Sequence, residues 1–304
     1  MKKLAVITSH PIQYNAPLFK ALAESNTIVL QVFYTWGQSV EMVFDPGFGE
    51  TRKWDIALLQ GYPYKFMENV SKNPGSHHFA GIDNPSLIKE IEFFEADAIL
   101  VYGWSFKSHL KVLRYFKGRK TILFRGDSTL LDEAKGYSLR KLFRRVSLKW
   151  VYSHIDFALY VGLKNKEYFL AHGLKPAQLV YAPHAIDNDR FAEPDATYQQ
   201  VAVSLKNSVG IKMEDLVLLF AGKLEKKKDP LFLIRLLEKI PDKRLKVLYV
   251  GSGHLLGTIQ TAARADDRVI VMGFKNQQEM PAVYRMADLF ILPSSGPGET
   301  WGLP

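Results

Sequence analysis

Residues 216–230, LVLLFAGKLEKKKDP, constrain the fold of this chain more than any other stretch. Their first six residues form a short apolar run, which is typical of a strand buried on both faces of a parallel sheet. The run stops at Gly222, and a helical pattern with apolar residues three apart begins at Leu231. This order predicts a β/α unit whose turn lies at the carboxyl end of its strand, where open α/β sheets place their ligands.

The turn of this unit is basic. It contains Lys223 and a run of three lysines that ends at Lys228. Lysines beside a helix N-terminus suit an anion such as a diphosphate. A lysine run is also common on a solvated surface, and the run alone does not distinguish these interpretations.

The same alternation of short apolar runs and helical patterns extends over the chain and predicts an α/β fold with parallel sheets. In the first part, strands are expected at 4–8, 28–34, 98–102, 121–124, 157–161 and 179–182, and helices at 17–23, 84–94, 108–116, 138–152 and 163–171. In the second part, strands are expected at 216–221, 246–250, 269–272 and 289–292, and helices at 198–209, 231–239, 254–264 and 280–287. Residues 37–54, 62–70 and 72–82 are expected to be irregular. We therefore expect two Rossmann-like domains, 1–190 and 206–304, joined by a linker over 191–205.

Composition narrows the class of protein. A length of 304 residues suits two domains, and the absence of cysteine excludes disulfides, thiolate metal sites and a cysteine nucleophile. The net charge of +9 favours anionic partners. Nucleic acid is not expected, because neither zinc-finger spacing nor an RNP-like motif occurs. The apolar run at 4–7 is too short for a signal peptide, so we expect a cytoplasmic protein that is at most peripheral to a membrane.

A strongly basic helix is predicted at 139–150. Its apolar residues follow helical spacing and are Leu139, Leu142, Phe143, Val146 and Trp150. Its basic residues are Arg140, Lys141, Arg144, Arg145 and Lys149, and no acidic residue occurs from 134 to 155. Such a helix can lie on an anionic membrane surface. It can equally pack its apolar side on the sheet and present a basic outer face.

No metal site is expected. His77 and His78 are adjacent, so their side chains would point in different directions, and no further ligand stands at metal spacing nearby. Asp187 and Asp189 flank Asn188, and two carboxylates alone specify no metal.

Every strand of the predicted second domain ends in a polar or glycine-rich turn. These turns contain Gly222 with Lys223, Gly251 with Gly253, Gly273 with Phe274, and the segment 294–299. Parallel strands bring such turns to one edge of the sheet, and glycine lets the backbone approach a phosphate closely. The ordered set predicts an anion-binding edge with Lys223 and Lys228 as its cations.

With these motifs, the chain resembles the retaining glycosyltransferases of family GT4. The resemblance covers nearly the whole chain and rests on HPIQYNAPLF at 10–19, YAPHAIDNDRF at 181–191, the basic segment 221–230, and PSSGPGETWGLP at 293–304. It implies the GT-B fold, in which two Rossmann-like domains face a cleft. It also implies transfer of a sugar from a UDP- or GDP-type nucleotide-sugar, without a metal or another cofactor.

The resemblance implies roles for particular residues. Lys223 and Lys228 would hold the donor diphosphate and stabilise charge on the leaving group. Glu299 would contact hydroxyls of the donor sugar. Further donor-binding residues would be Gly222, Gly251, Gly253, Gly273, Phe274, Thr300, Trp301 and Gly302.

On the acceptor side, the resemblance implies functional groups at the ends of first-domain strands. The candidates are His10, Gln13 and Asp127, with Trp104 as a weaker one. Arg125 would keep Asp127 ionised, although the two could equally form a structural ion pair. The expected acceptor is a glycan or a lipid-linked intermediate at the inner membrane face.

The chain departs from the family pattern at its C-terminal end. The family has a second glutamate eight positions after Glu299, which would be position 307, and the sequence ends at Pro304. We therefore expect an incomplete second domain. Two alternatives stay open: a nucleotide-sugar epimerase of GT-B fold, which would need acid and base groups around the sugar, and a non-catalytic fragment that binds a nucleotide-sugar.

Overall fold

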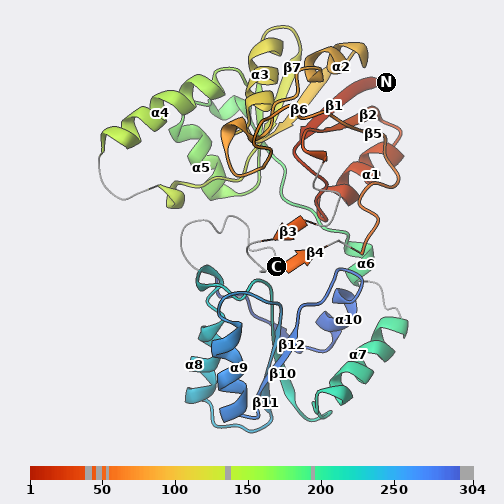
Figure 1. Ribbon diagram of the computed structural model, residues 1–304, viewed down its shortest axis with the longest axis vertical. Coiled ribbons are helices and arrows are strands. Elements are labelled where there is room, and N and C mark those ends of the chain that lie inside the picture. The colour runs from red at the N-terminus through yellow and green to blue at the C-terminus, as the bar shows by residue number, and fades with distance from the viewer. Residues whose placement is uncertain (38–42, 46–49, 53–54, 134–137, 193–195, 295–304) are drawn as a thin grey trace. The chain divides into compact units, whose positions relative to one another are not determined.

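The computed structural model describes residues 1–37, 43–45, 50–52, 55–133, 138–192 and 196–294 (Figure 1). The chain divides into two compact units. The N-terminal unit comprises Met1–Glu41 and Ala57–Asp187, and the C-terminal unit comprises Met42–Ile56 and Asn188–Pro304. Each unit is built around its own parallel sheet, as the alternating pattern of the sequence predicts.

In its described part, the N-terminal unit has a seven-stranded parallel sheet with the order β5-β2-β1-β6-β7-β8-β9. The strands are β1 Lys2–Thr8, β2 Ile28–Tyr34, β5 Tyr64–Phe66, β6 Ala98–Tyr102, β7 Thr121–Arg125, β8 Phe157–Tyr160 and β9 Leu179–Tyr181. In the central strand β1, Val6 pairs with Val32 on one side and with Leu100 on the other. Ala5, Val6 and Ile7 are fully buried, because helices cover both faces of this sheet.

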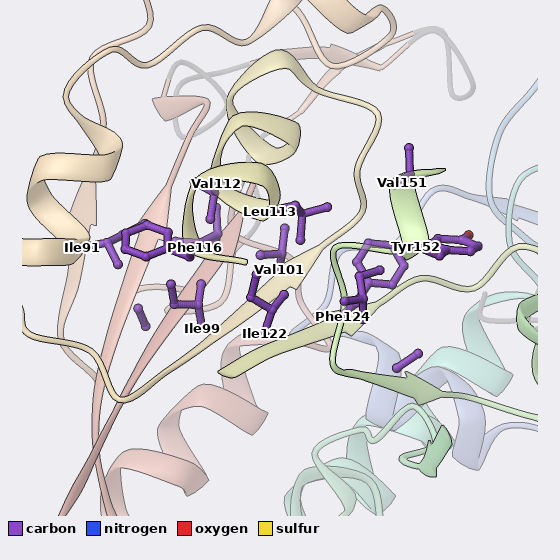
Figure 2. Close-up of a cluster of buried hydrophobic side chains, with 14 of the residues drawn as sticks. Ile91, Ile99, Val101, Val112, Leu113, Phe116, Ile122, Phe124, Val151 and Tyr152 are labelled. Atoms are coloured by element: carbon purple, nitrogen blue, oxygen red, sulfur yellow. The ribbon is translucent and has the colours of Figure 1, made fainter. Parts of the chain in front are cut away.

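The helices of this unit are α1 Ala16–Glu24, α2 Leu87–Phe93, α3 Lys107–Phe116, α4 Leu139–Tyr152 and α5 Leu163–Ala171, with 3-10 turns η2 Phe79–Gly81, η3 Leu130–Asp132 and η4 Pro176–Gln178. Figure 2 shows the core between one face of the sheet and the helices α2, α3 and α4. Its labelled residues are Ile91, Ile99, Val101, Val112, Leu113, Phe116, Ile122, Phe124, Val151 and Tyr152. The other face of the sheet packs against Phe19 of α1.

The C-terminal unit has a second parallel sheet, with four strands in its described part in the order β12-β11-β10-β13. The strands are β10 Leu216–Ala221, β11 Leu245–Val250, β12 Val269–Gly273 and β13 Leu289–Phe290. The helices are α6 Asn188–Ala192, α7 Ala196–Ser208, α8 Leu231–Lys239, α9 Leu256–Ala265 and α10 Met280–Arg285. The turn η5, Lys226–Lys228, is a 3-10 turn. Alternate residues of β10 face opposite cores. Leu219 packs toward α7 and α10, whereas Phe220 packs toward α8 and α9 (Figure 1).

Two stretches expected to be irregular contain strands, so those expectations were wrong. β5 adds an edge strand beside β2, and the amide of Met67 donates to the carbonyl of Tyr34 at 2.8 Å. β3 (Val43–Asp45) and β4 (Glu50–Arg52) form an antiparallel pair. Strands of three residues are too short to show a period of two in the sequence, and their pairing with a neighbour determines them.

The segment 191–205, expected to be a linker, contains the end of α6 and most of α7. Ala202 of α7 is buried in the core of the C-terminal unit. The helix predicted at 198–209 therefore begins two residues earlier than expected, at Ala196. Among the described residues, no helix combines the length and the apolar character needed to cross a membrane.

Candidate functional site

The turns that follow β10, β11 and β12 lie side by side at the carboxyl edge of the C-terminal sheet. Backbone hydrogen bonds continue between them beyond the strand ends. The amide of Gly222 donates to the carbonyl of Val250 at 2.9 Å, and the amide of Gly251 donates to the carbonyl of Gly273 at 2.7 Å. The glycine-rich turns therefore form one continuous surface, as the parallel topology requires.

Two glycines allow the turns to approach this closely. Gly251 and Gly253 have φ values of +142° and +152°, in the region that L side chains rarely adopt. A Cβ atom on Gly251 would lie 2.0 Å from the carbonyl oxygen of Gly222, and a Cβ on Gly253 would lie 2.6 Å from that of Leu224. Any side chain at these positions would push the turn after β11 away from the turn after β10.

The three consecutive lysines are not equivalent. Lys226 and Lys227 are exposed, whereas Lys228 is only 6% exposed. The difference arises because η5 turns the chain inward, and Asp229 ends this turn in the left-handed conformation with φ +43°. An ammonium group is costly to bury unless polar or anionic groups surround it. Lys228 therefore does not belong to a purely solvated lysine run.

The other predicted donor-side residues follow the same strand ends. Lys223 is half-buried and comes directly after Gly222, and Phe274 is half-buried and comes directly after Gly273. The chain that follows β13 runs beside β10, since the amide of Ile291 donates to the carbonyl of Leu219 at 2.8 Å. Glu299, Thr300, Trp301 and Gly302 lie outside the described residues.

In the N-terminal unit, Arg125 at the end of β7 organises the carboxyl edge of the sheet. Its side chain is buried, Nη1 donates to the carbonyl of Ala182 at 2.8 Å, and Nη2 donates to that of Pro183 at 3.1 Å. The guanidinium therefore holds the segment that follows β9. Sequence reasoning assigned Arg125 an effect on Asp127 and missed this second role, because it depends on how the chain returns after β9.

The returning segment brings His184 to this edge. Arg125 Nη2 lies 3.4 Å from His184 Nδ1, and the Tyr14 ring packs edge-on against the His184 ring with centroids 5.5 Å apart. Burial, followed by the charge of Arg125, lowers the pKa of His184, while Asp127 opposes this shift. Burial and the charge of Asp127 raise the pKa of Tyr14. His184 is thus a candidate that the sequence reasoning missed, although its place directly after a strand was a usable signal.

The remaining acceptor-side candidates lie in the turn after β1 and after β6. His10 Nδ1 lies 2.9 Å from Ser9 Oγ, its ring packs edge-on against Trp36, and burial lowers its pKa. Gln13 is half-buried in the same turn, just before α1. Trp104 packs against the hydrophobic core of the unit, so its position is accounted for by packing.

Neither His77 with His78 nor Asp187 with Asp189 belongs to a larger set of metal ligands among the described residues. Within the part of the chain that the structure describes, no group of three or more His, Asp or Glu side chains could hold a metal ion. The rings of His77 and His78 pack edge-on against each other, and His78 Nε2 lies 3.0 Å from the carbonyl oxygen of Asn73. Asn188, between the two aspartates, begins helix α6.

Comparison with known proteins adds a family match. Residues 204–304 match the family model described as "Glycosyl transferases group 1". A D-inositol 3-phosphate glycosyltransferase of Xylanimonas cellulosilytica is 30% identical over 127 residues, which are 40% of this chain and 30% of that protein. The chain aligns with only 25% to 32% of the length of the first curated relatives that it matches.

Solved structures resemble the chain over nearly its whole length. The Anabaena protein HepE, in complex with UDP and glucose, has a TM-score of 0.60 at 13% identity, over 97% of this chain and 74% of that one. The UDP-GlcNAc 2-epimerase of Methanocaldococcus jannaschii has a TM-score of 0.56 at 13% identity, over 95% of this chain and 78% of that one. Identities this low establish the fold alone.

The fold is GT-B, an α/β architecture with two Rossmann-like units, as the sequence predicted. The match of residues 204–304 to the group 1 glycosyltransferases is consistent with the expected family GT4.

Proposed function

We propose that this chain transfers a sugar from a nucleotide-sugar to an acceptor, with retention of configuration and without a metal ion. The observation that carries the proposal is the buried Lys228 in the turn after β10, a turn that glycines of the next turn approach closely, within the segment that matches the group 1 glycosyltransferases. Transfer breaks the bond between the sugar and the diphosphate, and negative charge develops on the leaving diphosphate. Lysines placed before the reaction begins stabilise that charge most effectively.

In this proposal, Lys223 and Lys228 bind the diphosphate, and the amides of the glycine turns lie close to it because no side chains intervene. Gly273 and Phe274 border the base, and Glu299 binds hydroxyls of the sugar. UDP is the first donor nucleotide to test, since the similar protein HepE is in complex with UDP and glucose. GDP donors are the second.

On the acceptor side, we propose Asp127 and His184 as the groups that orient the acceptor hydroxyl, with His10 and Gln13 beside the turn after β1. The reason is that Asp127, Tyr14 and His184 interact electrostatically at one sheet edge. The acceptor class proposed is a glycan or a lipid-linked intermediate on the cytoplasmic side of a membrane.

A second candidate function is epimerisation of a nucleotide-sugar, since the UDP-GlcNAc 2-epimerase of Methanocaldococcus jannaschii shares this fold. The two functions differ in products. An epimerase converts the donor sugar when no acceptor is present, whereas a transferase releases nucleoside diphosphate in step with acceptor glycosylation. A non-catalytic binding protein would bind nucleotide without either reaction.

The test compares Lys223→Ala and Lys228→Ala with Lys226→Ala, a matched control because Lys226 is exposed on the same turn. We expect kcat for donor consumption to fall about 100-fold or more in each site variant, the typical effect of removing one group that stabilises developing charge. The control should keep wild-type turnover. Equal turnover in all three variants would contradict the proposal, and UDP or GDP binding measured by calorimetry would separate a binder from an enzyme.

A further inference from the structure

Helix α4 presents its apolar residues to solvent. Leu139, Phe143 and Val146 are 86%, 74% and 62% exposed. With Leu142 and Trp150, which are also exposed, they form what we call the α4 stripe. The helix extends at the edge of the N-terminal unit beside α5 (Figure 1). Contiguous exposed apolar side chains on a folded protein mark a surface that contacts something else.

The stripe lies on one side of the helix, opposite the face that packs on the protein. At about 100° per residue, the five stripe positions fall within an arc of about 100°. The buried residues of α4 are Leu148, Val151 and Tyr152, and the same rotation places them on the opposite side. Of the two sequence interpretations of this helix, packing of its apolar side on the sheet with a basic outer face is therefore wrong.

Basic side chains border the stripe. Arg145 and Lys149 are exposed, and on neighbouring α3 the guanidinium of Arg114 lies 5.6 Å from the ring centroid of Trp150. Other cations of the helix contact the protein itself: Lys141 lies 3.5 Å from Glu133, and Arg144 donates to the Tyr168 hydroxyl at 3.1 Å. The sequence from 134 to 155 contains no acidic residue.

We propose that the α4 stripe binds an anionic phospholipid surface, with its apolar side chains in the interfacial region and the bordering cations at the lipid head groups. An apolar stripe with cations beside it fits an anionic bilayer, and Trp150 suits the interface because its indole is both apolar and a hydrogen-bond donor. A second copy of the same surface is a poor occupant, since it would bring cations against cations.

This inference deepens the proposed function, because a lipid-linked acceptor would be met at such a surface. Its test does not depend on catalysis. The protein is incubated without donor or acceptor with vesicles of phosphatidylcholine alone or of phosphatidylcholine with phosphatidylglycerol, and binding is measured by cosedimentation. We expect binding to the anionic vesicles to be at least tenfold tighter than to the neutral ones and to weaken as salt rises.

Two variants test the two components of the surface. Phe143→Glu/Val146→Glu removes apolar contact, and Arg145→Glu/Lys149→Glu reverses two bordering charges. Each should lower binding to anionic vesicles at least tenfold. The matched control is Phe93→Glu/Val203→Glu, since Phe93 and Val203 are exposed apolar residues on α2 and α7. The control should bind as the wild type does, and all variants should keep the wild-type circular dichroism spectrum and nucleotide affinity.

Several results would overturn the proposal. These are equal binding to neutral and anionic vesicles, wild-type binding by both stripe variants, or an equal loss in the control. A wild-type oligomer that Phe143→Glu/Val146→Glu dissociates, without any effect on vesicle binding, would instead assign the stripe to contact between copies. Loss of vesicle binding with unchanged nucleotide affinity would support the lipid site, whatever the outcome of the lysine variants.

Discussion

The guanidinium of Arg125 lies 3.4 Å from the ring nitrogen Nδ1 of His184. It also donates hydrogen bonds to the carbonyls of Ala182 and Pro183, the two residues before His184. Arg125 ends β7, and His184 follows β9, which lies two strands away in the sheet. Burial, and next the cation beside Nδ1, favour the neutral imidazole and lower the pKa of His184. The neutral ring then accepts at Nδ1 and carries its proton on Nε2.

Replacement of Arg125 should therefore release the segment after β9. In Arg125→Met, the carbonyls of Ala182 and Pro183 lose charge-assisted donors, which should cost about 2–4 kcal/mol of stability. Arg125→Lys should recover only part of the loss, because one ammonium cannot reproduce the fork of two guanidinium nitrogens. Urea denaturation measures both values. Equal stability of the wild type and Arg125→Met would show that the segment is held by other contacts.

Asp127 and His184 can be separated by kinetics. If both orient the acceptor, Asp127→Asn and His184→Ala should each lower kcat for transfer by about 100-fold, the lower range for a positioned acid or base. Donor affinity should not change, because the proposed donor site lies in the C-terminal unit. Steady-state transfer assays and calorimetry with UDP check the two quantities. Loss of donor affinity with unchanged kcat would place these residues in donor binding.

The glycine turns give a steric prediction with an internal control. Gly251→Ala would place Cβ 2.0 Å from a backbone oxygen, at a φ of +142°. Relief requires movement of the backbone, so we expect a loss of about 2–4 kcal/mol in stability and weaker nucleotide binding. Gly257 in α9 has open space at its Cβ position, so Gly257→Ala should gain up to about 1 kcal/mol. Thermal unfolding measures the stability of the two variants, and calorimetry measures their nucleotide binding. Similar effects of Gly251→Ala and Gly257→Ala would rule out the steric argument.

The burial of His109 in α3 should make the folded protein less stable in mild acid. Its Nδ1 donates toward the carbonyls of Tyr102 and Gly103, its Nε2 accepts from Thr35 at 2.9 Å, and burial lowers its pKa to about 4. Between these two pKa values, His109 therefore stays neutral in the folded state, whereas in the unfolded state it binds a proton below its ordinary pKa of 6.5. Stability falls as pH drops from 6.5 toward 4, and the loss between pH 7.5 and 5 is about 2 kcal/mol.

Comparison of the wild type with His109→Gln isolates this contribution, because His10 and His184, whose lowered pKa values act in the same direction, are present in both. Urea denaturation at the two pH values should show a decline that is smaller in the variant by that amount. An identical decline would mean that His109 titrates normally in the folded protein.

The sequence predicted the central strands best. The bounds expected for β2, β6 and β10 agree with the structure, because strands buried on both faces are continuous apolar runs between polar turns. The edge strand β5 left no such run, since a three-residue strand is defined by its neighbour. For α4, helical spacing identified the apolar side chains but not which side of the helix packs on the protein.

The site was predictable to a similar extent. Strand ends followed by glycine and lysine pointed to the edge around Gly222, since parallel topology alone brings them together. Sequence did not separate Lys228 from Lys226 and Lys227, because their burial depends on the turn η5. His184 was missed because its place beside Tyr14 depends on where Arg125 holds the chain.

The chain passes between its two units three times, after Glu41, after Ile56 and after Asp187. The first segment to enter the C-terminal unit, Met42–Ile56, is hydrogen-bonded to it. The amide of Gln278 donates to the Asp55 carboxylate at 3.1 Å, and the Gln278 side chain donates to the backbone carbonyl of Asp55. A cut after Asp187 would therefore leave the downstream piece without a segment that folds with it. Experiments on the separate units therefore require co-expression of the two pieces or a circular permutant.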